Sequence, residues 1–367
     1  MRVLLTIPDL AAAAGGPPVL VTRLAAALRE AGDEVVLMFG ERPGVPQLAV
    51  PEGVTARVVA GHRNPWQRFR QFRDAVISTI ETQRIEIVHD HGLWLPENAA
   101  SAIGATRSAR PWVAQPCGML QDWSLQQQRL KKRLAWLAYQ RRLIGRSAAL
   151  IAASDSETRE TAARLPAKLP VHCIAHGVDL PEISITAPRK RQAVFLGRLH
   201  PVKQVDVLLR SWAELAPQDW QLRIAGGGEP GYEAMLKALA ASLGIGDAVQ
   251  FLGPMQGEAK SALLSESQLF LQPSQQENFG LSVLEALAHG LPALTTQAMP
   301  WAQLPAVGCG WSVAPNAPAI TATLGSALAL PATQLAAMGA LGREYASGYS
   351  WAATARATRL VYAQARA

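Results

Sequence analysis

Two glutamates eight residues apart are the side chains whose types and spacing most clearly suggest chemistry. Glu277 and Glu285 belong to the segment ENFGLSVLE, which follows one apolar run and begins another. We expect Glu277 in a loop and Glu285 on the helix after it, and the backbone N–H groups at the helix start would attract phosphate. Those groups belong to Phe279, Gly280 and Leu281. Carboxylates on either side could hold hydroxyl groups, although an ordinary acidic helix start would show the same spacing.

A second charged pair lies in the segment GRLHPVK, directly after another apolar run. Arg198 and Lys203 would stand on a turn at the carboxyl end of a strand, where α/β domains bind ligands. The planar fork of Arg and the point charge of Lys together suit a diphosphate. The alternative is a pair of solvated surface cations.

Three glycines at 226, 228 and 231 formally match a dinucleotide-binding fingerprint. Pro230 interrupts the expected turn, and no acidic residue ends a strand about twenty positions later. A tight turn close to a bound base is the milder interpretation of the same glycines. A dehydrogenase, which would rest on these glycines alone, is therefore the weakest alternative.

The elements that must position these residues form two successive α/β patterns. Apolar strand-like runs occupy 3–7, 34–39 and 86–92 in the first half and 193–198, 222–226, 249–253, 269–274 and 292–296 in the second. Amphipathic helical runs occupy 20–32 and 205–215. The stretch 176–191, with two prolines and a basic cluster, is predicted to be the linker. A cleft between two such domains is the usual ligand site.

The composition is that of a globular two-domain chain. The 367 residues are 49% hydrophobic, and the three cysteines are widely spaced, which favours a reducing compartment over a disulfide framework. Pro8 and Asp9 break the N-terminal apolar run, so a buried strand is expected there rather than a signal peptide. No run approaches the length of a membrane span. We expect a cytoplasmic protein.

The net charge of +7 is concentrated in one place. Seven Lys and Arg residues and no acidic residue lie between Trp123 and Ser154, where an apolar stripe recurs at helical spacing. The stripe consists of Leu130, Leu134, Leu137 and Ile144. The segment 125–146 could lie on an anionic membrane, or its leucines could pack into the first domain beneath a solvated basic face. No nucleic-acid-binding motif accompanies the basic residues.

The order of these motifs resembles glycosyltransferase family 4. In the second half the motifs are GRLHPVK, IAGGGE, FLGP (251–254) and ENFGLSVLEALAHGLP (277–292). The first half adds GGPP (15–18), IVHDHGLW (87–94), PCGMLQDWSL (116–125) and HGVDLP (176–181), which resemble a bacterial polysaccharide-assembling branch. The resemblance covers nearly the whole chain.

The resemblance implies a GT-B fold, in which two Rossmann-like domains face each other across a cleft. Residues 1–180, with a crossover helix at 350–367, would bind the acceptor, and residues 181–349 would bind the nucleotide-sugar donor. The implied reaction moves a hexosyl group, with retention of configuration, from a UDP- or GDP-linked sugar to a glycan or lipid-linked acceptor. The resemblance places this reaction in cell-surface polysaccharide biosynthesis, in the cytoplasm or at the inner face of the membrane.

The family's functional residues carry over onto matching positions. Glu277 would bind the donor sugar, Glu285 the ribose, and Arg198 and Lys203 the diphosphate. Backbone groups would contact phosphate at Phe279, Gly280 and Leu281, and at Gly16 of the other domain, while Gly226 and Pro254 would line the base. Many members have a histidine where this chain has Cys117, and His89 or His91 is a possible substitute.

The resemblance also bears on mechanism and alternatives. Retention without a second carboxylate near the reacting face favours a front-face reaction, in which Arg198 and Lys203 carry the charge that develops on the leaving group. No Asp-x-Asp pair or metal-ligand spacing is present in the sequence, so we expect neither a metal nor another cofactor. The alternatives are a nucleotide-sugar epimerase on the same scaffold and a catalytically impaired nucleotide-sugar-binding protein.

Overall fold

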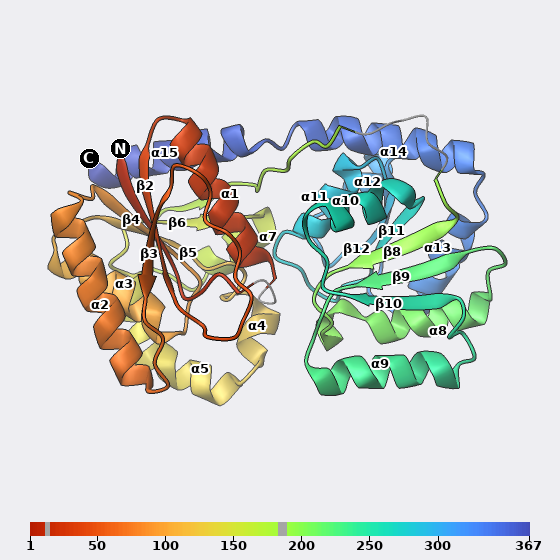
Figure 1. Cartoon of the computed structure of the whole chain (residues 1–367), viewed down its shortest axis with the longest axis horizontal. Helices are drawn as coiled ribbons and strands as arrows, with labels where there is room; N and C mark the ends of the chain where they lie inside the picture. The colour runs from red at the N-terminus through yellow and green to blue at the C-terminus, as the bar shows by residue number, and fades with distance from the viewer. Residues whose placement is uncertain (12–14, 183–188) are drawn as a thin grey trace. The chain divides into compact units, whose positions relative to one another are not determined.

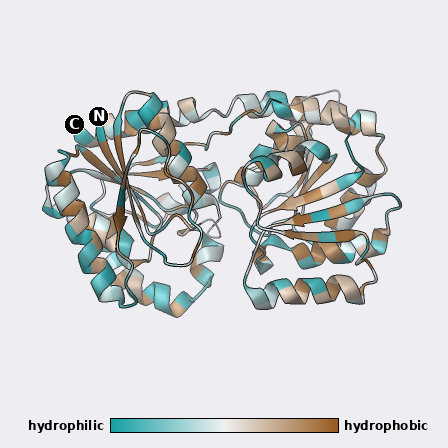
Figure 2. Ribbon diagram, viewed as in Figure 1, coloured by the Kyte–Doolittle hydropathy of each residue, from teal (hydrophilic) through white to brown (hydrophobic). Residues whose placement is uncertain are grey.

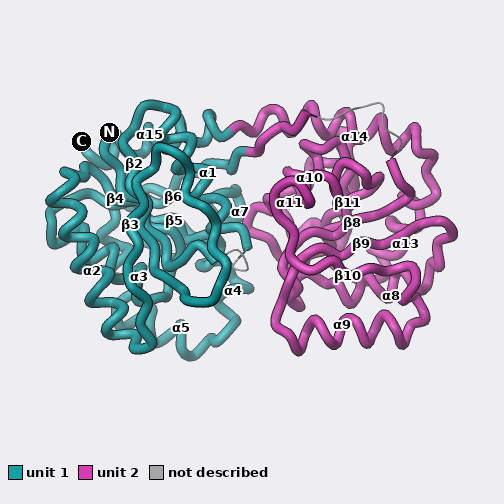
Figure 3. The backbone as a smooth tube through the Cα atoms, viewed as in Figure 1, with its two compact units in different colours: residues 1–177, 351–367 teal, residues 178–350 magenta. Residues whose placement is uncertain are grey.

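The chain divides into two compact units in a computed structural model that describes residues 1–11, 15–182 and 189–367. Unit 1 comprises Met1–Gly177 together with Trp351–Ala367, and unit 2 comprises Val178–Ser350 (Figure 3). Of the predicted linker, residues 183–188 lie outside the described residues.

Unit 1 is built on a parallel sheet whose described strands run in the order β3-β2-β1-β4-β5-β6-β7 (Figure 1). The strands are β1 (Arg2–Ile7), β2 (Glu34–Gly40), β3 (Thr55–Val59), β4 (Ile87–His91), β5 (Trp112–Gln115), β6 (Ala149–Ala152) and β7 (Val171–Cys173). Apolar side chains on both faces of the central strands are buried, as expected for a parallel sheet covered by helices on both sides (Figure 2).

Two layers of helices cover this sheet. They are α1 (Gly16–Glu30), α2 (Pro65–Thr82), α3 (Pro96–Arg107), α4 (Asp122–Gln126), α5 (Arg129–Ala135), the π-helix η2 (Trp136–Gln140), α6 (Arg141–Ile144), α7 (Asp155–Ala162) and α15 (Trp351–Arg366). The expected helix at 20–32 begins earlier, because Pro17 and Pro18 fit a first turn where no backbone N–H is needed. Asn64 caps α2 by accepting a hydrogen bond from the Trp66 N–H at 2.8 Å.

The last helix of the chain belongs to the first unit. On α15, Val361 and Tyr362 are buried in the hydrophobic cluster formed by β1 and α1. The Tyr362 hydroxyl and His89 Nδ1 at β4 share a hydrogen bond of 2.8 Å. Residues separated by the whole of unit 2 therefore complete one core.

Unit 2 repeats the architecture with a parallel sheet whose described strands run in the order β10-β9-β8-β11-β12-β13. The strands are β8 (Gln192–Leu196), β9 (Gln221–Ala225), β10 (Val249–Gly253), β11 (Leu269–Gln272), β12 (Ala293–Thr296) and β13 (Gly310–Val313). The helices are the 3₁₀-helix η3 (Pro201–Lys203), α8 (Val205–Leu215), α9 (Pro230–Ser242), α10 (Gly257–Glu266), α11 (Leu281–Ala288), α12 (Leu304–Val307), α13 (Ala317–Leu328) and α14 (Ala332–Ser347).

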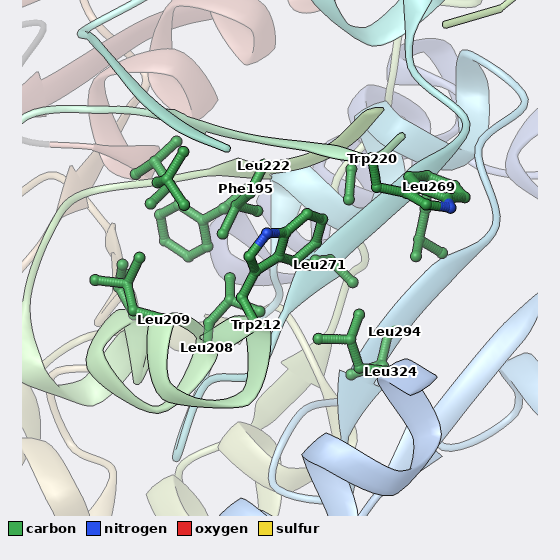
Figure 4. Close-up of a cluster of buried hydrophobic side chains, with 14 of the residues drawn as sticks. Phe195, Leu208, Leu209, Trp212, Trp220, Leu222, Leu269, Leu271, Leu294 and Leu324 are labelled. Carbon is green, nitrogen blue, oxygen red and sulfur yellow. The ribbon is translucent and has the colours of Figure 1, made fainter. Parts of the chain in front are cut away.

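One face of this sheet packs around a fully buried tryptophan. Trp212 on α8 lies in one cluster with Leu208 of the same helix and with Phe195, Leu271 and Leu324, which come from β8, β11 and α13 (Figure 4). Burial of a side chain of this size makes this cluster a main contributor to the stability of unit 2.

No single helix among the described residues is long and apolar enough to cross a membrane. One pair, α13 with the stretch Ala332–Arg366, has the length and apolar composition of a membrane span only when the two are taken together, and a bend of 111° separates them.

Candidate functional site

The predicted site residues of unit 2 gather where the sheet changes its winding direction. Strands β8 and β11 are neighbours, whereas β9 and β12 continue the sheet on opposite sides. The loops after β8 and β11 therefore leave the same edge and bend apart, which is the usual ligand position in such sheets. A hydrogen bond of 2.8 Å from the Gln275 N–H to the Val202 carbonyl joins the two loops.

Lys203 and Glu277 form an ion pair across these loops. The Lys203 ammonium donates a hydrogen bond to Glu277 Oε2, and the two side chains are 13% and 20% exposed. The backbone N–H of Lys203 bonds the His200 carbonyl at 2.8 Å, which fixes the short η3 helix that carries the lysine. A partly buried pair of this kind is neutral overall, yet each charge remains within reach of solvent and of a ligand.

Arg198 lies on the same loop and its side chain is exposed. Burial and then the charge of Arg198 lower the pKa of His200, and Lys203 lowers it further, whereas Glu229 raises it. The two cations therefore act on one small region, and His200 between them favours its neutral form. Arg198 and Lys203 are therefore two cations on one loop with which a diphosphate could pair.

The loop before α11 is held in a conformation that requires glycine. Gly280 has φ +81°, and a Cβ there would lie 2.9 Å from Trp301 Nε1. Trp301 donates from Nε1 to the Phe279 carbonyl at 2.6 Å, so the loop is fixed from behind. The first turn of α11 leaves backbone N–H groups without partners in the helix, as at every helix start. Glu277 precedes this turn and Glu285 lies on the helix, both as expected.

The glycine turn after β9 packs directly on the Arg198 loop. Gly226 has φ +143°, and a Cβ at this position would lie 1.8 Å from the Gly197 carbonyl oxygen. The Gly226 N–H bonds the Gly253 carbonyl at 2.7 Å, and Pro254 contacts the same turn at Gly227. Gly226 and Pro254 thus lie beside the loop that carries Arg198. Pro230 does not interrupt the turn, because it is the first residue of α9.

Lys260 is a candidate site residue that sequence reasoning missed. Its ammonium on α10 donates to Glu285 Oε1 on α11 at 2.8 Å, and the side chains are 25% and 18% exposed. No signal in the sequence points to this pair, because the two residues lie on different helices. Both carboxylates singled out from the sequence are therefore paired with a lysine.

Two family models match the chain, and between them they span most of it. Residues 14–182 match Glycosyltransferase Family 4. Residues 180–339 match Glycosyl transferases group 1.

Solved structures show the same fold over the whole chain. The sucrose-phosphate synthase of Thermosynechococcus elongatus superposes with a TM-score of 0.80, at 19% identity, over 99% of this chain and 98% of that one. The Anabaena protein HepE, solved in complex with UDP-glucose, superposes with a TM-score of 0.78, at 17% identity, over 99% and 100%. Together with the two family models, this fold identifies the chain as a glycosyltransferase of the GT-B type.

Several curated relatives of this glycosyltransferase are named D-inositol 3-phosphate glycosyltransferase. A D-inositol 3-phosphate glycosyltransferase of Actinosynnema mirum is 29% identical over an alignment of 396 residues, gaps included. The alignment covers 96% of this chain and 93% of that one. Another of the same name, from Catenulispora acidiphila, is 34% identical over 181 residues, and this match covers 47% of this chain and only 42% of that protein.

In unit 1 of this glycosyltransferase, Gly16 is the first residue of α1. The preceding Gly15 has φ +87°, and neither glycine would bring a Cβ within 4 Å of another group. Three residues before them, 12–14, lie outside the described part of the chain. The predicted contact of Gly16 with phosphate stays a prediction.

Cys117 stands in the loop after β5 with φ +53°. Burial and then the nearby Glu157 carboxylate raise the pKa of its thiol above the usual range, so this thiol stays neutral at physiological pH. The Glu157 carboxylate accepts from the backbone N–H groups of Gly118 at 2.5 Å and Ala153 at 2.7 Å, which joins the loops after β5 and β6. Cys117 is therefore not an acid–base group in this structure.

The two histidines considered as substitutes are both fully buried in unit 1. His89 bonds Tyr362, and His91 Nδ1 donates to the Thr6 carbonyl at 3.2 Å. Burial lowers the pKa of both, that of His91 to about 4. Both rings are neutral at pH 7 and have structural contacts, and neither is presented to solvent.

Proposed function

We propose that this glycosyltransferase moves a hexosyl group from a UDP- or GDP-linked sugar to a glycan or lipid-linked acceptor, with retention of anomeric configuration. The observation that supports this best is the convergence in unit 2 of Arg198, the Lys203–Glu277 pair and the start of α11 at the switch point of the sheet. Two cations and a helix N-terminus suit a diphosphate. The adjacent carboxylate suits sugar hydroxyl groups.

The Lys203–Glu277 pair supplies both halves of the donor contact. In the structure each charge neutralises the other. A bound donor would give Lys203 a phosphate oxygen as a second partner, while the free oxygen of Glu277 accepts from a hydroxyl of the sugar. Arg198 and the N–H groups of residues 279–281 would hold the remaining phosphate oxygens.

Retention is proposed to follow from a front-face reaction. The acceptor oxygen approaches the anomeric carbon on the side from which the diphosphate leaves, so the new bond forms as the old one breaks. The acceptor proton passes to an oxygen of the departing phosphate. Arg198 and Lys203 stabilise the negative charge that grows on that group.

The reaction is proposed to need no divalent metal and no other cofactor. The support is that Arg198 and Lys203 lie on one loop after β8, where their positive charges would take the role that a metal has in other diphosphate sites. Turnover should persist in excess chelator. Loss of turnover in chelator, restored by one divalent ion, would contradict this part of the proposal.

The first experiment is calorimetric binding of UDP, GDP and ADP, with Arg198→Ala as the comparison. We expect one nucleotide to bind the unaltered protein and to bind Arg198→Ala at least about tenfold more weakly, because a charge-assisted contact is lost. If none of the three bound, the proposed donor site in unit 2 would be wrong.

The products separate a transferase from the alternatives on the same scaffold. With the preferred donor and an acceptor extract, a glycosyltransferase releases nucleoside diphosphate and forms a new glycosidic bond. An epimerase would leave the nucleotide sugar intact with one inverted centre, and a binding protein would leave it unchanged. Proton NMR of the product also reports the anomeric configuration. We place the reaction in cell-surface polysaccharide assembly, at the cytoplasmic face of a membrane.

A further inference from the structure

A row of leucines on α5 and η2 faces solvent. Leu130, Leu134 and Leu137 are spaced four and three residues apart, so they lie on one side of the helical segment. They are 77%, 69% and 68% exposed. Of the four residues in the predicted stripe only Ile144 is buried. The expectation that the leucines pack into the first domain is therefore wrong, because other residues occupy the inward side.

The inward side of this segment is fixed by contacts of its own. Trp136 packs against the hydrophobic core beneath it and lies 6.2 Å from Trp94, ring centre to ring centre. Lys132 Nζ lies 5.9 Å from the Trp94 ring centre and donates to the Ser124 carbonyl at 2.5 Å. Turning the leucines inward would break these contacts, so their exposure belongs to the folded unit.

Exposed cations surround the leucine row. They are Arg129, Lys131, Arg133, Arg141, Arg142 and Arg146. No acidic residue occurs between Trp123 and Ser154 to neutralise them. Figure 2 shows hydrophobic and hydrophilic residues alternating along α5. A solvent-facing apolar row within a ring of positive charge fits a partner that is apolar inside and anionic at its surface.

The start of α2 continues this surface. Trp66 is 65% exposed and stacks on Phe69 with ring centres 5.4 Å apart. Arg68 Nε donates to Glu97 at 2.6 Å, which joins the start of α2 to the start of α3. Trp94, just before α3, in turn contacts Trp136 of η2. The starts of α2 and α3 therefore connect to the leucine segment, and we call residues 63–70 with 129–146 the basic edge.

We propose that the basic edge of unit 1 binds the surface of an anionic lipid bilayer. The leucines insert among the acyl chains, the arginines and lysines contact headgroup phosphates, and Trp66 lies at the interface, where tryptophan is favoured. This deepens the proposed function, because a transferase held on a bilayer acts on an acceptor anchored in that bilayer. Nucleic acid would use the cations and leave the leucines in water.

The test is flotation of the full chain with vesicles of phosphatidylcholine alone or with about one third phosphatidylglycerol. We expect binding only to the anionic vesicles, weakened by salt. The variant L130S/L134S/L137S should bind at least about tenfold more weakly, since three apolar side chains are lost from the lipid contact. Trp66→Ala should weaken binding about threefold. Because these side chains are exposed, none of the variants should lower the melting temperature appreciably.

The matched control is Leu360→Ser, at an exposed leucine of α15 outside the basic edge, which should bind as the unaltered chain does. Equal binding by the triple variant, or no binding of the unaltered chain, would overturn the proposal. So would a leucine-dependent dimer in lipid-free solution, or stronger retention on a DNA duplex than on vesicles. Nucleotide binding measured on the same samples tests the donor site separately, so the two proposals can fail independently.

Discussion

Lys203 is the residue on which the proposed chemistry most depends. Its ammonium contacts Glu277, which holds it near the position proposed for the leaving phosphate. We predict that Lys203→Ala lowers kcat by about a hundredfold or more, the usual cost of removing one donor to a developing anion. Steady-state kinetics with the preferred donor measure this. Near-normal kcat would show that the charge is stabilised elsewhere.

Lys260 is predicted to act through its neighbour rather than on the donor directly. Lys260 donates a hydrogen bond to one carboxylate oxygen of Glu285 and so fixes the orientation of the carboxylate. Glu285 is the residue proposed to hold the ribose. Lys260→Met should raise the Kd for the nucleotide by about tenfold, the size of one hydrogen bond to a charged group, with little change in kcat.

A 2′,3′-dideoxynucleotide distinguishes positioning by Lys260 from a general structural role. Positioning predicts that the unaltered enzyme discriminates against the dideoxynucleotide and that Lys260→Met discriminates less. The control is Lys190→Met, which removes a lysine paired with Glu266 on the exposed surface. It should change neither the Kd for the nucleotide nor the discrimination against the dideoxynucleotide. An unaltered discrimination ratio in Lys260→Met would refute the positioning role.

At the scale of elements, the site depends on how closely the loops after β8 and β9 approach each other. Gly226→Ala would place a methyl group 1.8 Å from the Gly197 carbonyl, so the loops must separate. We predict a loss of roughly 2–4 kcal/mol in the free energy of unfolding of unit 2, together with weaker nucleotide binding. Urea denaturation and calorimetry measure the two effects.

Gly231→Ala is the matched control for this change. Gly231 lies in the first turn of α9, and a Cβ there would meet nothing within 4 Å. The alanine should stabilise the helix by roughly 0.5–1 kcal/mol and leave nucleotide binding unchanged. If the two variants behaved alike, close loop packing would not be what Gly226 provides.

The helices and strands around the site could be predicted from the sequence, whereas the contacts between them could not. The strand–loop–helix order around GRLHPVK and ENFGLSVLE was readable because the apolar runs and the glycines are local signals. The ion pair of Lys203 with Glu277 was not predicted, because it depends on two strands meeting at one edge of the sheet and not on spacing along the sequence. The Lys260–Glu285 pair depends on how two helices pack, which no local pattern records. Helical spacing also revealed the leucine stripe without showing which side of it would be covered.

At the scale of the whole molecule, buried histidines should make unit 1 sensitive to acid. Burial lowers the pKa of His91 from 6.5 to about 4 and that of His176 to about 3. Between pH 6.5 and pH 4 these histidines are protonated in the unfolded chain but stay neutral in the folded unit. The free energy of unfolding therefore falls as the pH falls from 6.5 towards 4. Asp90, whose pKa burial raises from 3.8 to about 7, acts in the opposite sense over the whole of this range and offsets about one of the two histidines.

His91→Gln is predicted to reduce this dependence. One such group contributes up to about 1.4 kcal/mol per pH unit, or about 3 kcal/mol over its whole shift. Urea unfolding at pH 7, 6 and 5 should therefore show a shallower loss of stability in the variant, whatever its stability at pH 7. His62→Gln, at an exposed histidine, serves as the comparison. Equal slopes in His91→Gln and the unaltered chain would contradict the prediction.

The contribution of α15 to unit 1 has a consequence for synthesis on the ribosome. Residues 351–367 are translated after all of unit 2, yet Tyr362 is enclosed in the core of unit 1 and bonds His89. Unit 2 is continuous in sequence and can fold as soon as it has been translated. Unit 1 must wait with part of its core open until α15 arrives. The N-terminal half of the chain is therefore the last to be completed, and during translation it is the half that most needs protection by chaperones.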